Sequence, residues 1–148
     1  MRRRGSQILT AAALGLVVAF ALVGCDGQSE VSGDKYSIYV QDALFPREGE
    51  DGVVFGRLVT RDGCVLLEEG DIAFPVIWPR GTSIASEDPL TLELPSGENI
   101  TMGERVRGGG GLHDPSSPKV KVEISADCLL QTNSVGVFNA DDDPVVVE

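Results

Sequence analysis

The chain has 148 residues and a formal net charge of −11, from 23 acidic and 12 basic side chains. This length supports one domain with a modest core. A nucleic-acid-binding protein needs positive charge to replace the counterions of the phosphates, so the composition excludes that class of function.

The first 24 residues have the pattern of a secretory signal peptide. Arg2, Arg3 and Arg4 form a positive segment, and Thr10 is the single polar side chain within residues 8–23. This apolar segment is short for a membrane-spanning helix, which needs about 20 apolar residues. We therefore expect residues 1–24 to be removed on export, and an uncut signal anchor is the alternative.

A cysteine closes this segment, in the sequence Leu22-Val23-Gly24-Cys25. These four residues resemble the lipobox of bacterial lipoproteins. The resemblance implies a diacylglyceryl group on the sulfur of Cys25, cleavage before it, and a protein held on the extracytoplasmic face of a cell membrane. Two acyl chains are sufficient for stable anchoring. The resemblance extends to Asp26, which in a host with an outer membrane is similar to the signal that keeps lipoproteins in the inner membrane.

Once Cys25 is assigned to lipid, Cys64 and Cys128 are the remaining cysteines. Outside the cytoplasm two such thiols most simply form a disulfide. Closing the loop between them should stabilise the fold by about 4 kcal/mol. Neither a CxxC spacing nor a histidine cluster accompanies the pair, so we expect no metal site.

The polar residues 25–35 read as a flexible tether, and residues 36–148 as a single β domain. Asp62-Gly63 is a strong hairpin-turn dipeptide, and a second turn falls at residues 95–98. Alternating apolar residues predict strands at 36–40, 53–60, 64–68, 90–94, 99–102, 120–124, 135–138 and 145–147. A short helical turn is expected within residues 126–132.

Glycine and proline are spaced so closely that long helices are excluded, and the chain is expected to be all-β. We favour a small closed or partly open antiparallel barrel of the OB type, with a two-sheet sandwich as the alternative. Four segments resemble uncharacterised exported domains of high-GC Gram-positive bacteria: GRLVTRDGCV, PVIWPRGT, LELPSG and MGERVRGGGG. That resemblance supports secretion and implies no particular activity.

The segment FPVIWPRGT, residues 74–82, carries the first candidate binding site. Its two prolines cannot donate ladder hydrogen bonds, which predicts an edge strand or a barrel rim. Trp78 and Arg80 at such a rim would have the composition of a recognition surface. The alternative is that Trp78 fills the core.

A run of glycines at residues 108–111 carries the second candidate site, with Gly109 and Gly110 at its centre. No lysine and hydroxyl residue follow the run, so a phosphate-binding loop is excluded. A flexible loop, or a close approach of the backbone to a neighbour or a ligand, explains it better. His113 is the only histidine, and we expect its ring to be exposed.

These observations favour a lipid-anchored binding or accessory module of the cell envelope, with no cofactor and no catalytic residue assigned. Its expected partners are the membrane, through the lipid on Cys25, and an envelope protein or small ligand. A small envelope hydrolase that uses carboxylates and a structural subunit of a membrane complex remain alternatives.

Overall fold

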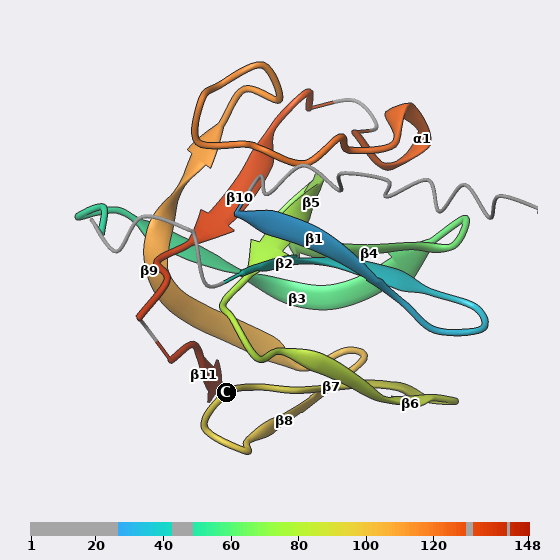
Figure 1. Ribbon diagram of the computed structural model, residues 1–148. Helices are drawn as coiled ribbons and strands as arrows, with labels where there is room; N and C mark the ends of the chain where they lie inside the picture. The colour runs from blue at the N-terminus through green and yellow to red at the C-terminus, as the bar shows by residue number, and fades with distance from the viewer. Residues whose placement is uncertain (1–26, 43–48, 130–131, 142) are drawn as a thin grey trace, which may run out of the picture.

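The computed structural model describes residues 27–42, 49–129, 132–141 and 143–148, so the predicted signal peptide and Cys25 lie outside the described residues. Within these ranges the chain is all-β with one short helix, as expected (Figure 1). The elements are β1 (Gln28–Ser32), β2 (Ser37–Gln41), β3 (Val53–Arg61), β4 (Cys64–Glu69), β5 (Ile72–Trp78), β6 (Ser83–Glu87), β7 (Leu90–Glu93), β8 (Asn99–Thr101), β9 (Arg105–His113), α1 (Ala126–Leu129), β10 (Val135–Phe138) and β11 (Val145–Val147).

The larger sheet returns on itself. Strands β3, β4 and β5 form an antiparallel meander, and β9 pairs antiparallel with β3. Strand β10 lies between β9 and β5; it is antiparallel to β9 and parallel to β5. Strands β6, β7 and β8 form a separate antiparallel sheet. A ring-like sheet with a small second sheet is consistent with both architectures expected from the sequence, the barrel and the sandwich.

Both predicted hairpins are confirmed. In the first, Arg61 pairs with Cys64 across the two-residue turn, where Asp62 and Gly63 have φ values of 51° and 85°. Two positive φ angles are what a tight turn between twisted strands requires, and an Asp-Gly dipeptide provides them at low cost. In the second, β7 and β8 flank the turn at residues 95–98.

The prediction of an edge strand at residues 74–78 is wrong, because β5 is paired along both sides. Pro75 lies opposite Leu66 at the last pair of the β4 ladder. Pairing with β10 begins one residue later, at Val76, and pairing with β2 begins at Ile77. The proline therefore lies where β2 replaces β4 as the neighbour of β5, and its missing N–H falls at the ends of ladders.

The predicted flexible tether is also corrected. Gln28–Ser32 form β1, which pairs with the whole of β2, and the backbone oxygen of Gly27 accepts a hydrogen bond from Asp42 at 2.9 Å. The polar composition of this strand reflects its position at the edge of the sheet, where polar side chains are tolerated on both faces. Gly27, two residues after Cys25, therefore already belongs to the folded domain.

Residues 120–124 form no strand, contrary to the alternation of their side chains. The alternation is still expressed in packing, because Val120, Val122 and Ile124 contact a buried cluster that includes Tyr39 and Ile77. The backbone of this segment runs beside β1 and is held by side chains instead of a strand ladder. The alternation therefore correctly identified Val120, Val122 and Ile124 as the side chains that pack inward. It wrongly predicted that the backbone of this segment pairs with another strand, because the backbone bonds to the side chain of Gln28.

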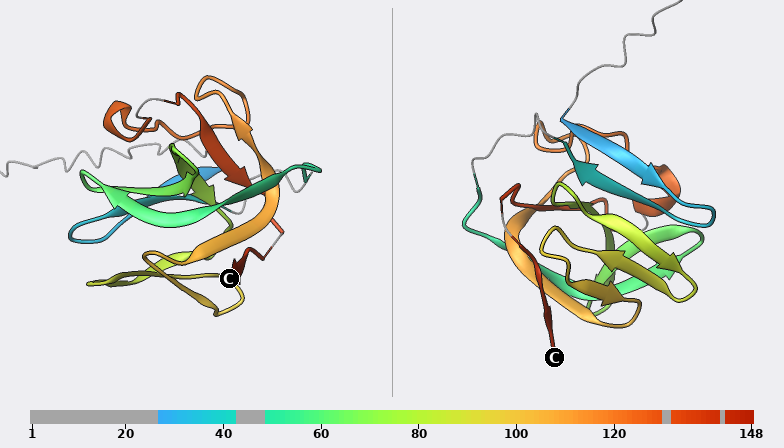
Figure 2. Two further views of the ribbon diagram at one scale, coloured as in Figure 1. Left: turned by 180° about the vertical axis from the view of Figure 1, so that it is seen from behind. Right: turned by 60° about the horizontal axis from the view of Figure 1, so that its bottom comes forward.

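The main core lies between the ring and the small sheet. Trp78, Phe74 and Phe138 are its largest fully buried side chains. Leucines and an isoleucine of the small sheet enter the same cluster: Leu90, Leu92, Leu94 and Ile100. Each such burial is worth about 1.5–3 kcal/mol, so the small sheet is an integral cover of the ring. On the opposite side, α1 and the segment before it cover the ring, as the left-hand view of Figure 2 shows.

Candidate functional site

The predicted Trp78–Arg80 recognition surface is absent from the described molecule. Trp78 is 1% exposed and its ring centroid lies 5.3 Å from that of Phe138, so this residue fills the core. Arg80 is half-buried, and its Nε donates a hydrogen bond to the backbone oxygen of Asp42 at 3.1 Å. The alternative assignment of Trp78 to the core is the correct one.

The glycine run lies in β9 and is not a flexible loop. Gly108 and Gly109 pair with β3, and Gly110 and Gly111 pair with β10. A Cβ on Gly110 would lie 2.1 Å from the backbone oxygen of Val137, and the φ of 151° at Gly110 disfavours any other residue. The close-approach interpretation is confirmed, and the neighbour is strand β10 instead of a ligand.

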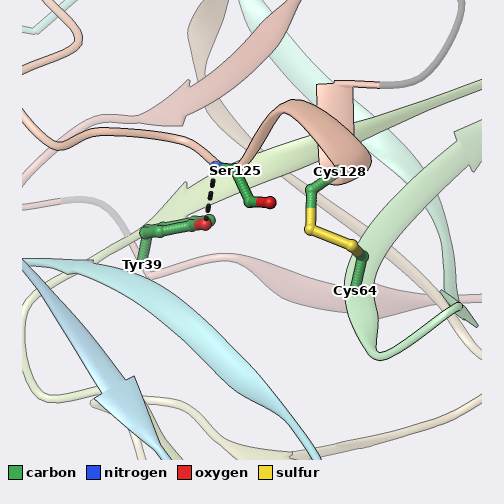
Figure 3. Close-up of a disulfide and its surroundings, with 4 residues drawn as sticks. All are labelled: Tyr39, Cys64, Ser125 and Cys128. Carbon is green, nitrogen blue, oxygen red and sulfur yellow. Dashed lines mark hydrogen bonds between the residues drawn. A yellow bond between two sulfur atoms is a disulfide. The ribbon is translucent and has the colours of Figure 1, made fainter.

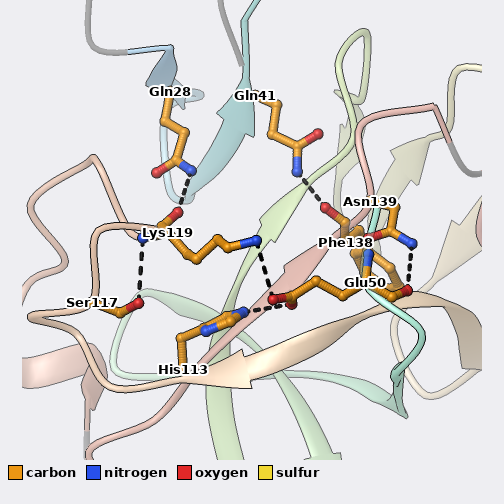
Figure 4. Close-up of polar contacts among 8 residues, drawn as sticks. All are labelled: Gln28, Gln41, Glu50, His113, Ser117, Lys119, Phe138 and Asn139. Carbon is orange, nitrogen blue, oxygen red and sulfur yellow. Dashed lines mark hydrogen bonds and ion pairs between the residues drawn. The ribbon is translucent and has the colours of Figure 1, made fainter. Parts of the chain in front are cut away.

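His113, at the end of β9, is the centre of a polar cluster (Figure 4). Its Nε2 lies 2.7 Å from Oε2 of Glu50, and Nζ of Lys119 lies 3.3 Å from Oε1 of the same carboxylate. The side chains of His113 and Glu50 are 15% and 28% exposed. The prediction of an exposed histidine ring is therefore wrong, because residues far apart in the sequence bring a carboxylate onto it.

Asn139 fixes the position of Glu50 through the backbone. Its Oδ1 accepts the Glu50 N–H at 2.8 Å, and its Nδ2 donates to the Glu50 backbone oxygen at 3.0 Å. A Cβ on Gly111 would lie 2.4 Å from Oε2 of Glu50, so the glycine leaves the space that the carboxylate occupies. The amide of Asn139 and the space beside Gly111 together fix the position of the Glu50 carboxylate.

The charge state of Glu50 follows from its partners. Burial raises the pKa of this carboxyl, but hydrogen bonds from His113 and Lys119 outweigh burial, and the pKa is lowered. Among the described residues, no serine, threonine or cysteine side chain hydrogen-bonds to His113. The cluster therefore holds a carboxylate between two nitrogen donors without a nucleophile, and it clamps residues 113–119 to the ring.

The start of β1 lies beside this cluster. The side chain of Gln28 donates from Nε2 to the Lys119 backbone oxygen at 2.8 Å and accepts the Lys121 N–H on Oε1 at 2.6 Å. Figure 4 shows Gln28 above Lys119, with Gln41 close to Gln28. The Nε2 of Gln41 donates a hydrogen bond to the backbone oxygen of Phe138. The first strand is thereby tied to the segment that follows β9.

The predicted disulfide is confirmed. Cys64, at the start of β4, is bonded to Cys128 in α1, and their Cα atoms are 5.5 Å apart (Figure 3). Close to it, the hydroxyl of Tyr39 accepts the Ser125 N–H at 3.2 Å. Both contacts hold α1 and its preceding segment onto the ring.

No protein-family model, curated protein or solved structure matches the chain. Among the described residues, no helix is long and apolar enough to span a membrane. Within the same ranges, no three side chains of His, Cys, Asp or Glu lie close enough together to hold a metal ion.

Proposed function

We propose that the chain is a lipid-anchored protein on the extracytoplasmic face of a cell membrane, where its β domain acts as a binding module. Two independent features of the chain support this proposal. The residues Leu22 to Cys25 have the lipobox pattern. The Cys64–Cys128 disulfide fits an oxidising compartment outside the cytoplasm, since such bonds are rare where thiols are kept reduced.

The main support for the proposal is that Gly27 already belongs to the folded domain, where its backbone oxygen accepts the Asp42 N–H at 2.9 Å. Consecutive Cα atoms are about 3.8 Å apart, so Cys25 lies at most about 8 Å from Gly27. The headgroup layer on each side of a bilayer is about 5–8 Å thick. A lipid on Cys25 would therefore hold the domain against the headgroups, whereas a tether over residues 25–35 would allow a separation of about 35 Å.

This geometry predicts which end of the domain faces the membrane. Lys119 and Lys121 lie at the start of β1, where Gln28 binds their backbone. The right-hand view of Figure 2 has the start of β1 at the top and the C-terminus with β11 at the bottom. We expect the β1 end to contact headgroups and the β11 end to be open to envelope partners.

Replacement of the anchor and a depth measurement test these two parts separately. Cys25→Ala should leave an unprocessed precursor or release the protein from washed membranes; normal processing with unchanged membrane retention would contradict the lipid anchor. In reconstituted lipidated protein, brominated lipids should quench the fluorescence of a Lys121→Trp variant more than that of the original chain, which contains Trp78. The matched control is a Met102→Trp variant, since Met102 is next to Gly103, which lies beside the end of β11. Equal quenching of the two variants would contradict the orientation alone.

A further inference from the structure

Three arginines gather on the outward face of β3 and β9. Arg57 of β3 is directly opposite Arg105 of β9, and Arg107 follows two residues along β9. Val106 between the two β9 arginines is buried, so Arg105 and Arg107 point to the opposite, solvent side of the strand. All three side chains are exposed.

This arrangement is unexpected in an acidic chain. Like charges directly opposite one another on neighbouring strands are destabilising, and acidic residues outnumber basic ones 23 to 12. Yet the side chains of Arg105 and Arg107 make no hydrogen bond or ion pair with any residue that the structure describes. Arg57 donates from Nη1 to the backbone oxygen of Gly103 at 2.6 Å, which leaves its remaining N–H groups available.

The acidic side chains on the neighbouring strand and in the pocket form no ion pair with these arginines in the described chain. Glu68 of β4 is directly opposite Arg57, but its ion pair is with Arg61. Glu104 accepts the Thr101 N–H on Oε2 at 2.7 Å. Glu148 lines the same pocket as Arg57 but makes no ion pair with either pocket arginine within the described chain.

The arginines also border a hollow in the surface. A pocket of about 490 Å³ is lined by Arg57, Gly103, Glu104, Arg105, Val146, Val147 and Glu148. The valines belong to β11, which pairs with β9 through Val147 and Arg105. Two arginines and two glutamates therefore share this lining, and neither glutamate forms an ion pair with these arginines in the described chain. A concave site with a few convergent polar groups is the usual form of a ligand site.

We infer that this surface binds a ligand that carries oxyanion groups, either phosphates or carboxylates. A guanidinium group offers paired N–H donors that match the two oxygens of such a group, and the bonds are charge-assisted. Neighbouring strands are about 4.8 Å apart and residues i and i+2 about 6.8 Å apart, so the three arginines fit a ligand whose oxyanions are about 5–7 Å apart. Bound anions would remove the repulsion between Arg57 and Arg105.

The inference does not depend on the lipid anchor, but the two are compatible. Arg105 and Arg107 lie on β9 opposite residues of β11, and Arg57 lies on β3 opposite Arg105. Strand β11 is at the end of the domain away from the start of β1 (Figure 2). A lipid-anchored domain would present this surface to the envelope and not to the headgroups.

Titration of the full chain in detergent with two anions tests the inference. Tripolyphosphate and citrate carry the two oxyanion types, and isothermal titration calorimetry at low salt measures their affinities. Arg105→Gln should weaken the binding by about tenfold or more, because a charged hydrogen-bond donor is lost. The matched control is Lys121→Gln, which removes one positive charge from an exposed side chain near the start of β1, and it should stay within about twofold of the original affinity.

The melting temperature separates this result from misfolding. Arg105→Gln removes a like-charge contact, so the variant should melt no lower than the original chain. Saturable binding of one probe alone would support the inference and assign phosphate or carboxylate as the ligand type. Binding of neither probe at millimolar concentration, or equal losses in the Arg105→Gln and Lys121→Gln variants, would overturn it.

Discussion

Glu87, at the end of β6, joins the small sheet to the turn between β1 and β2 through its carboxylate. It accepts the backbone N–H groups of Asp34, Lys35 and Tyr36 at 3.1, 2.8 and 3.1 Å. The N–H of Lys35 makes the largest contribution to lowering the pKa of Glu87, and together the three donors outweigh its desolvation. A Cβ on Gly33 would lie 2.3 Å from Oε1, so any other residue here would displace the carboxylate from its present position.

This pKa direction predicts the pH dependence of a Glu87→Gln variant. A carboxylate whose pKa is lower in the folded state stabilises the fold above its ordinary value of 4.5, and that contribution is lost as the pH falls through the lowered value. The variant should therefore melt below the original chain at neutral pH and together with it near pH 2. Glu93→Gln, at an exposed position of β7, is the control. A melting difference that is the same at both pH values would contradict this role.

Gly110 tests the close approach of β9 and β10. Gly110→Ala should lower the free energy of unfolding by about 2–5 kcal/mol, because the new Cβ meets the Val137 carbonyl and the backbone is strained. Gly97→Ala is the control, since Gly97 also has a positive φ but nothing lies within 4 Å of its Cβ. It should cost about 1–2 kcal/mol. Equal losses in chemical denaturation would show that the contact with β10 contributes nothing.

At the scale of elements, the disulfide joins α1 to the ring over a sequence separation of 64 residues. Cys64→Ala combined with Cys128→Ala should lower the free energy of unfolding by about 4 kcal/mol, since the unfolded chain regains the entropy of an open loop. Thermal melts with and without reductant provide the control, because reductant should destabilise the original chain only. A reductant effect of the same size in the double variant would contradict the assignment.

Local patterns predicted the elements whose stability is local. The Asp62-Gly63 hairpin, the pair β7–β8 and the closing strands were identified because turn chemistry and alternation act over a few residues. The segment 120–124 was assigned to a strand because alternation reports which side chains are buried. It cannot report that the backbone meets the side chain of Gln28 instead of another strand.

The candidate sites were harder to predict than the strands. Trp78 and its prolines have the composition of a rim, but Pro75 lies at a junction of three ladders, which depends on the order of strands across the whole sheet. The polar cluster needed Glu50, His113 and Asn139 to meet from distant parts of the chain. Only the histidine gave any local signal, and it pointed to an exposed ring.

In the whole molecule, the two ends of the domain have different proposed roles. The start of β1, close to Cys25, is the end that a lipid would hold at the membrane. The surface with Arg57 of β3 and Arg105 and Arg107 of β9 is the one that we propose for an anionic ligand. The chain has a formal net charge of −11, so a place where three arginine side chains gather is favoured for an anion.

Intact-mass spectrometry of the protein extracted by detergent from expressing bacteria is the sharpest test of the proposed lipid on Cys25. We expect a chain that begins at Cys25 and carries the additional mass of a diacylglyceryl group. A chain that retains residues 1–24, or one that begins at Cys25 without lipid, would contradict it.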